Sequence, residues 1–326
     1  MVKNLLGEQY AIRLKEQTVV DEKTICMDGE YYYLIIEVKN KEVIHMEQAA
    51  LAEYLVENGY THTFVPIPNV NGEWLTAYDG QVYLVLKTAQ FQHDTTMSHG
   101  QQLAAFHAIG STYPFEPKKI SSYGKWKELW INKLTVYETK AAQEAKKHPS
   151  AYYENVMNML PYMIGMSENA IQYVQESEQD NRFHEHDQGT ICFHRYTGQL
   201  LQPALWPVDF VYDHPARDLA EYIRARLLNH NLDSAAGEIV QFLQEYQQVH
   251  PLSVFGLRLL YARLLFPVHL FDLVGQGFLH TNPSMLFDDL IKLCNQQIDY
   301  EAKLRMFFKL VGVDPQLLHI PMLHWL

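Results

Sequence analysis

The sequence lacks several features that mark secreted or nucleic-acid-binding proteins. It has only three cysteines, Cys26, Cys192 and Cys294, and they lie far apart. An odd and widely spaced set excludes a disulfide framework and is typical of a reducing compartment. The formal net charge of −12 argues against nucleic acid as a partner.

Long apolar runs are also missing. Residues 1–17 contain no apolar core long enough for a signal peptide, so we expect synthesis in the cytoplasm. The most apolar later stretch, residues 257–274, contains Arg258, Arg263 and Pro267. Because a bilayer-spanning helix needs about 20 largely uncharged residues, this stretch is expected to be a buried helix. The sequence therefore predicts a protein without a membrane span.

The first part of the chain has the pattern of a small β-rich lobe. Residues 9–39 alternate between polar and apolar side chains as strands do, and residues 46–58 have helical spacing. Asn71-Gly72 and Asp79-Gly80 are hairpin turn signals. We therefore expect residues 1–88 to form an antiparallel sheet with one helix.

The rest of the chain is predicted to be mainly helical. Residues 98–109 form a helical pattern with Ser98 as its N-cap, and long patterns follow at 122–147 and 150–177. Two short strands are expected between residues 180 and 210, and helices follow from residue 215. Residues 89–326 are thus expected to be a large helical lobe with a short strand pair. The fold class is α+β and bilobal.

Polar residues follow both short strands. The first strand runs into His194-Arg195-Tyr196, and the second leads to Asp209-Phe210. A helix then begins near Asp218 in the segment Arg-Asp-Leu-Ala, and an earlier helix carries Leu-Ala-Ala-Phe-His, ending at His107. The order of these elements resembles the protein kinase-like fold of the aminoglycoside phosphotransferase and choline kinase branch over nearly the whole chain.

Within that branch, the helical tail and the eroded motifs resemble the spore coat kinase-like proteins of the CotS/YutH family. Phosphoryl transfer in the branch uses a strand lysine paired with a helix glutamate, a catalytic aspartate, and an asparagine and an aspartate that hold Mg²⁺. The resemblance puts Asp209 in the metal position and makes Glu47 a vestigial nucleotide-site candidate. It puts Tyr196 where the catalytic aspartate belongs.

These departures predict a degenerate catalytic loop. Tyrosine has a pKa of about 10 and is a poor base at neutral pH. The following loop has no asparagine and offers only Gln199 or Gln202, the strand at 33–37 has no central lysine, and Lys39 comes too late. No glycine-rich loop precedes that strand.

The leading hypothesis is therefore a structural or binding component of the bacterial endospore coat without phosphotransferase activity and without a cofactor. Two alternatives remain. One is an active small-molecule phosphotransferase with a rearranged site, which would require ATP and Mg²⁺. The other is a module that binds a small ligand without chemistry. The resemblance implies deposition on the spore coat after synthesis in the mother-cell cytoplasm, with other coat proteins as partners. A weak homo-oligomer remains open.

Other polar residues are expected to be structural. Asp218 can cap its helix or brace the loop, and the resemblance makes His107 structural. Asp209 is either vestigial or a metal ligand, although one carboxylate is a weak site for Mg²⁺. The segment 184–187, His-Glu-His-Asp, is either a metal site or a polar turn.

Two surface features have two interpretations each. Lysines are in excess between residues 118 and 147, which indicates either a solvated helix face or a docking surface for an acidic partner. Residues 320–326 are unusually apolar for a chain end. They either pack back on the helical lobe or anchor an interface.

Overall fold

A computed structural model describes residues 1–92 and 95–323. The chain forms two compact units, and each unit is built from two separate stretches of the sequence. Unit 1 contains residues 1–121 and 189–213, and unit 2 contains residues 122–188 and 214–326. The lobe boundary predicted at residue 88 does not coincide with this division, because unit 1 also includes the first helix and the short strand pair that follow residue 88.

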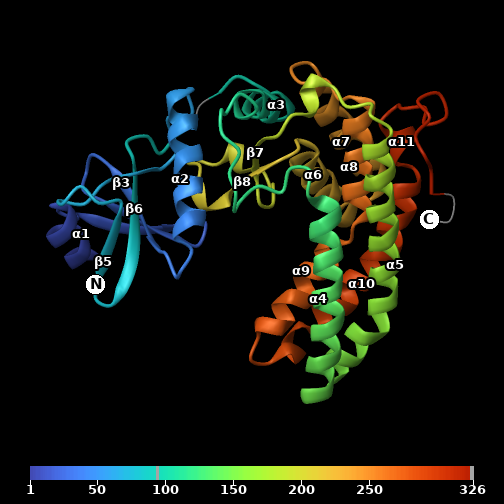
Figure 1. The fold of residues 1–326 in the computed structure, drawn as a ribbon, viewed down its shortest axis with the longest axis horizontal. Helices are drawn as coiled ribbons and strands as arrows, with labels where there is room; N and C mark the ends of the chain where they lie inside the picture. Colours follow the sequence, from blue (N-terminus) through green and yellow to red (C-terminus); the bar gives the residue numbers. More distant parts are fainter. Residues whose placement is uncertain (93–94, 324–326) are drawn as a thin grey trace. The chain divides into compact units, whose positions relative to one another are not determined.

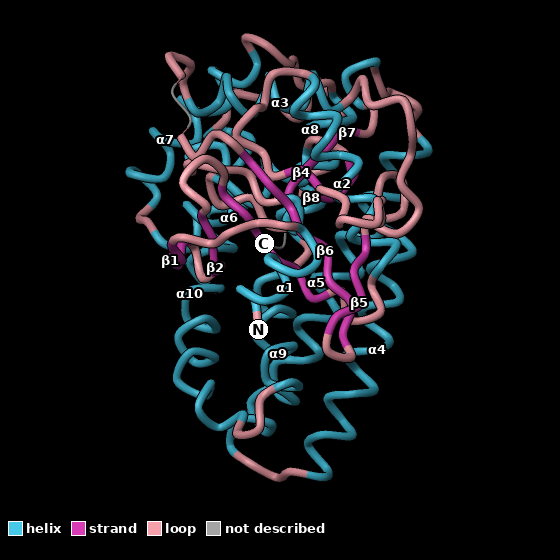
Figure 2. The backbone as a smooth tube through the Cα atoms, turned by 90° about the vertical axis from the view of Figure 1, so that its left-hand side faces the viewer, coloured by secondary structure: helices cyan, strands magenta, loops and turns pink. Residues whose placement is uncertain are grey.

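Unit 1 is built on an antiparallel sheet with the order β1-β2-β3-β6-β4, and β5 also pairs with β6. Its strands are β1 (Glu16–Val20), β2 (Lys23–Met27), β3 (Tyr32–Glu37), β4 (Val65–Pro66), β5 (Leu75–Tyr78) and β6 (Gln81–Thr88). The strands β7 (Thr190–Phe193) and β8 (Phe210–Asp213) form a separate antiparallel pair. In the described part of the chain, every strand lies in unit 1 (Figure 2).

Three helices belong to unit 1: α1 (Val2–Tyr10), α2 (Glu42–Glu57) and α3 (His99–Gly110). The expectation of one helix in the first 88 residues is therefore wrong, and residues 10–14 are not a strand. Leu6 and Tyr10 lie four residues apart on the buried side of α1, which is a helical spacing. The predicted helix at 98–109 is confirmed as α3, with Ser98 at the N-cap.

The two faces of the main sheet pack against different partners. Successive strand residues point to opposite faces, so Cys26 and Tyr33 pack with Leu6 of α1. Their neighbours Ile25 and Leu34 lie on the other face, in a separate apolar cluster. That second cluster also contains Ala204 and Trp206 from the connection between β7 and β8.

Unit 2 is helical. Its helices are α4 (Trp126–Lys147), α5 (Ala151–Gln179), α6 (Ala216–Asn229), α7 (Leu232–Gln247), α8 (Val254–Leu265), α9 (Val268–Leu279), α10 (Phe287–Arg305) and α11 (Phe307–Leu310). The long helices α4 and α5 run side by side, and α8 contacts α5 (Figure 1). Trp126 and Trp130 of α4 are buried, as expected for core residues at helical spacing. The Trp130 ring stacks on Phe266 with a centroid distance of 4.4 Å.

Within residues 1–92 and 95–323, no single helix is both long and apolar enough to cross a membrane. The consecutive helices α8 and α9 pass that test only as a pair, and they are bent by 42° where they meet.

The chain end packs on unit 2 as far as it is described. Ile320 is buried, and the Tyr173 hydroxyl of α5 donates a hydrogen bond to the Pro321 carbonyl at 2.8 Å. The last three residues of this apolar segment, His324, Trp325 and Leu326, lie outside the described residues.

Candidate functional site

The loop between β7 and β8 is braced by its own side chains. The His194 N–H donates to the Asp209 carbonyl at 2.7 Å, which closes the base of the hairpin. The Gln199 side chain accepts the Thr197 N–H at 2.8 Å and donates to the Arg195 carbonyl at 2.7 Å. Both the oxygen and the nitrogen of the Gln199 side-chain amide thus bind loop backbone. Gln199 was one of the two glutamines that could have replaced the missing asparagine.

Tyr196 points into the protein. Its side chain is fully buried, and its hydroxyl lies 2.6 Å from Nε2 of His99 on α3. The other two residues of the predicted catalytic loop differ from it: the His194 side chain is exposed, and an Arg195 guanidinium nitrogen donates to the His194 carbonyl at 2.9 Å. The residue at the catalytic position is therefore part of the core of unit 1.

Asp209 is half-buried and lies near a lysine from an unexpected strand. Its carboxylate is 3.8 Å from Nζ of Lys23, which belongs to β2. Burial raises the pKa of Asp209, and the negative charge of Asp21 adds to that effect, whereas Lys23 opposes it. The Lys23 ammonium also lies 5.1 Å from the centre of the Trp206 ring, within cation–π range.

Lys23 is the site residue that the sequence reasoning missed, because the lysine was sought on β3. A signal was available: Lys23 lies two residues before the buried Ile25, so strand alternation places both on the same sheet face. Lys39, by contrast, pairs with Glu37 at 3.4 Å, and both side chains are largely exposed.

The carboxylate of Glu47 on α2 accepts hydrogen bonds from backbone N–H groups, whereas in active kinases the corresponding glutamate pairs with a lysine side chain. The Glu47 carboxylate accepts the N–H groups of Lys118 at 2.8 Å, Lys119 at 2.9 Å and Ile120 at 3.1 Å. The next residue, Gln48, donates to the carbonyls of Val208 at 2.9 Å and Phe210 at 3.3 Å. The helix therefore braces the backbone on both sides of Asp209.

The turn between β1 and β2 is short and acidic. It consists of Asp21 and Glu22, both in the left-handed region with φ of 48° and 62°. Loops that hold phosphate use backbone N–H groups and positive charge. Here two carboxylates precede Lys23, so this turn is electrostatically unsuited to a phosphate group.

Trp206 covers the second face of the main sheet. Its side chain is 1% exposed and packs with Ile25, Leu34 and Phe64 in one apolar cluster. The Trp206 and Phe64 rings stack with a centroid distance of 5.1 Å and an interplanar angle of 18°. The preceding residue, Leu205, is held to the chain beside β4 because its N–H donates to the His62 carbonyl at 3.1 Å.

The two predicted structural residues lie in the core. His107 is fully buried on α3, and its carbonyl accepts a hydrogen bond from the Thr190 hydroxyl at 2.7 Å. Asp218 is fully buried in the first turn of α6, where a negative charge suits the helix dipole.

The segment His184–Asp187 separates into two groups. Asp187 is buried and accepts hydrogen bonds from the Ser253 hydroxyl at 2.8 Å and from His214 at 3.3 Å. His184, Glu185 and His186 bring possible ligand atoms within 4.8 Å of one another. The centres of the two imidazole rings lie 5.0 Å apart, with an interplanar angle of 21°.

The chain has the kinase-like fold of the aminoglycoside phosphotransferases. Unit 1 contributes the antiparallel sheet, the helices α2 and α3, and the β7–β8 pair with Tyr196 and Asp209, and unit 2 contributes the remaining helices. An aminoglycoside phosphotransferase from Alicyclobacillus acidocaldarius matches with a TM-score of 0.64 and 15% identity over 93% of this chain and 94% of that one. Spectinomycin phosphotransferase in its AMP-bound complex matches with a TM-score of 0.60 and 11% identity over 93% and 96%. Amicoumacin kinase matches with a TM-score of 0.56 and 13% identity over 93% of both chains.

The chain belongs to the family described as spore coat putative kinase YutH, whose sequence model matches residues 3–307. The endospore coat-associated protein YutH of Bacillus subtilis (strain 168) is 33% identical over 336 aligned positions, which span 100% of this chain and 98% of that protein. The predicted fold class and family are confirmed.

Proposed function

We propose that the protein is a catalytically inactive kinase-fold component of the bacterial endospore coat, with a structural or binding role. The observation that carries this proposal is the burial of Tyr196, which stands at the catalytic position and bonds to His99. A general base must reach the substrate hydroxyl. A fully buried phenol cannot do so without unfolding its surroundings.

The phosphate-binding part of the site also does not fit ATP. The third strand of the sheet has no lysine, and Glu47 is occupied by three backbone N–H groups. The Asp21-Glu22 turn adds negative charge close to Asp209. A nucleotide triphosphate would therefore meet repulsion from these carboxylates, which the ammonium group of Lys23 offsets in part.

The apolar packing of unit 1 supports the same conclusion. A nucleotide base needs an accessible apolar surface, but Trp206 and Phe64 cover the sheet face that bears Ile25 and Leu34. In this proposal the described residues around Asp209 do not form a complete site for either ATP or Mg²⁺.

The spore coat assignment comes from the family. The relative from Bacillus subtilis is named for its association with the endospore coat. By extension, we place this protein in the spore coat after synthesis in the mother-cell cytoplasm, with other coat proteins as partners. Its lysine-rich segment at 118–147 remains either a solvated face or a docking surface for an acidic partner.

One observation favours the rival function, an active small-molecule phosphotransferase. Lys23 reaches Asp209 from the strand next to β3, at 3.8 Å, so a lysine and a carboxylate do meet at the metal position. The exposed His194, or a nearby carboxylate, would then act as the base. This rival requires ATP and Mg²⁺.

Calorimetric titration of the full chain with ATP and Mg²⁺, followed by turnover assays on aminoglycosides, amino alcohols and sugars, tests the proposal. We expect neither tight binding nor turnover. Turnover that disappears in a folded Asp209→Ala variant would establish the rival instead. A thermal shift confined to one class of metabolite, without turnover, would indicate a ligand-binding module.

A further inference from the structure

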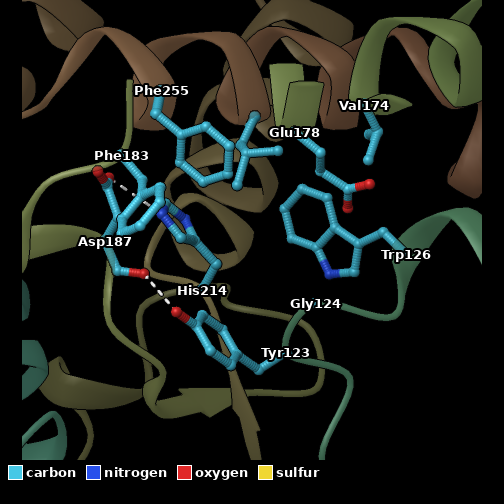
Figure 3. A pocket seen from close by; sticks show the side chains of 10 residues that line it. Tyr123, Gly124, Trp126, Val174, Glu178, Phe183, Asp187, His214 and Phe255 are labelled. Carbon is cyan, nitrogen blue, oxygen red and sulfur yellow. Dashed lines mark hydrogen bonds and ion pairs between the residues drawn. The ribbon is translucent and has the colours of Figure 1, made fainter. Parts of the chain in front are cut away.

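Unit 2 contains a cavity of about 240 Å³ that shares no residue with the Tyr196–Asp209 site (Figure 3). Aromatic side chains dominate its walls: Tyr123, Trp126, Phe183, His214 and Phe255. In Figure 3, Trp126 lies on one side of the opening and Phe183, His214 and Phe255 lie on the other. A concave and mainly apolar site with a few polar groups is the usual form of a small-molecule pocket.

Most polar groups around the cavity bind one another. The Tyr123 hydroxyl donates to the Asp187 carbonyl at 2.9 Å. The Asp187 carboxylate accepts hydrogen bonds from Ser253 at 2.8 Å and from His214 at 3.3 Å. These contacts fix one wall and leave that carboxylate satisfied.

Glu178 of α5 is different. Among the described residues, its carboxylate has no hydrogen bond or ion pair, and it lines the cavity beside Trp126 (Figure 3). Partial burial raises the pKa of Glu178, and Lys127 only partly opposes that effect. Because the side chain is exposed and yet lines the cavity, Glu178 lies at its mouth. A positive charge placed there would offset the cost of partial desolvation.

Size limits the occupant. A volume of 240 Å³ corresponds to about eight molecules of liquid water. A single ring or a short branched chain is of a size that this cavity accepts. The aromatic walls suit an apolar body, and Glu178 suits one positive charge.

We propose that this cavity binds a small organic cation, with an apolar body between the aromatic walls and an ammonium or guanidinium group next to Glu178. This site does not depend on phosphoryl transfer, since it lies in unit 2 and uses none of the kinase-type residues. Failure of the proposed function would therefore leave this proposal intact, and the reverse also holds.

The test compares two probes of nearly identical shape, 2-phenylethylammonium and 2-phenylethanol, by calorimetry on the full chain. We expect the cation to bind roughly threefold to fivefold more tightly than the alcohol, because an ion pair with a solvent-exposed carboxylate contributes up to about 1 kcal/mol. In Glu178→Gln this preference should disappear. Glu176→Gln is the matched control on α5, because Glu176 accepts a hydrogen bond from Gln172 and does not line the cavity.

A second variant tests the apolar walls. Phe183 is 62% exposed, so Phe183→Ala should keep the fold while weakening both probes together. The proposal is overturned if the alcohol binds as well as the cation, if Glu178→Gln keeps the preference, or if wild-type protein binds neither probe.

Discussion

Replacement of Trp206 by alanine tests whether this side chain stabilises unit 1 by packing on one face of its main sheet. The indole is 1% exposed and stacks on Phe64 at 5.1 Å. Removing a buried aromatic side chain costs about 3–5 kcal/mol, since the lost contacts leave a cavity. Because whole domains are stable by only about 5–15 kcal/mol, Trp206→Ala should lower the urea midpoint of unfolding substantially.

Trp206→Phe separates ring packing from the indole N–H. That N–H is buried and has no hydrogen-bond partner in the part of the chain that the structure describes. A buried unsatisfied donor costs about 1–3 kcal/mol. Phenylalanine removes this cost and keeps a stacking ring, so we expect a much smaller loss of stability than with alanine.

The assay is urea denaturation followed by far-ultraviolet circular dichroism. Trp74 is 41% exposed, so Trp74→Ala is the matched control and should change stability by no more than about 0.5 kcal/mol. A Trp206→Ala change as small as this control would refute the packing argument. Micromolar binding of ATP and Mg²⁺ to the wild-type protein would refute the conclusion that the sheet face is covered.

Tyr196→Phe keeps the ring but removes the hydrogen bond to His99, and should lower the free energy of unfolding by about 0.5–1.5 kcal/mol in the same assay; an unchanged midpoint would contradict this. Glu47→Gln weakens three charge-assisted backbone hydrogen bonds and should cost about 1–2 kcal/mol, whereas Glu57→Gln at the exposed end of the same helix should be neutral. Burial lowers the pKa of His269 to about 4, so the folded state resists its protonation. Above pH 6.5, the ordinary pKa of histidine, His269 should therefore not affect the free energy of unfolding. As the pH falls from 6.5 toward 4, the free energy of unfolding should decrease by about 3 kcal/mol, because the unfolded chain binds the proton more readily. Urea midpoints measured between pH 7 and pH 4.5 test this, and a flat profile would contradict it.

Much of the kinase-like frame could be predicted because it depends on local patterns. Ser98 at the N-cap of α3 and the apolar run before Tyr196, which forms β7, are such patterns. The second strand was expected at 205–208, before Asp209, and that expectation is wrong: Pro207–Asp209 is a short 3-10 helix, and β8 begins at Phe210, where it pairs with β7. Residue identity at the motif positions, above all tyrosine in place of aspartate, also needs no coordinates. These local features are sufficient to indicate the family, because none of them depends on a tertiary contact.

The first helix was missed because its sequence fits two periods. Tyr10 to Leu14 alternates like a strand, yet Leu6 and Tyr10 also share a helical face and pack against the sheet. Only burial of that face against Cys26 and its neighbours decides between them, since local propensity is weaker than tertiary packing.

The sequence by itself determined which kinase-type residues this chain lacks. It shows no lysine on β3, no asparagine in the loop and no aspartate at position 196. Only the tertiary structure decided which contacts are found at these positions: a lysine from β2 near Asp209, a buried tyrosine bonded to α3, and a glutamate bound to distant backbone. These contacts join residues that are tens to more than a hundred positions apart, and no local pattern encodes them.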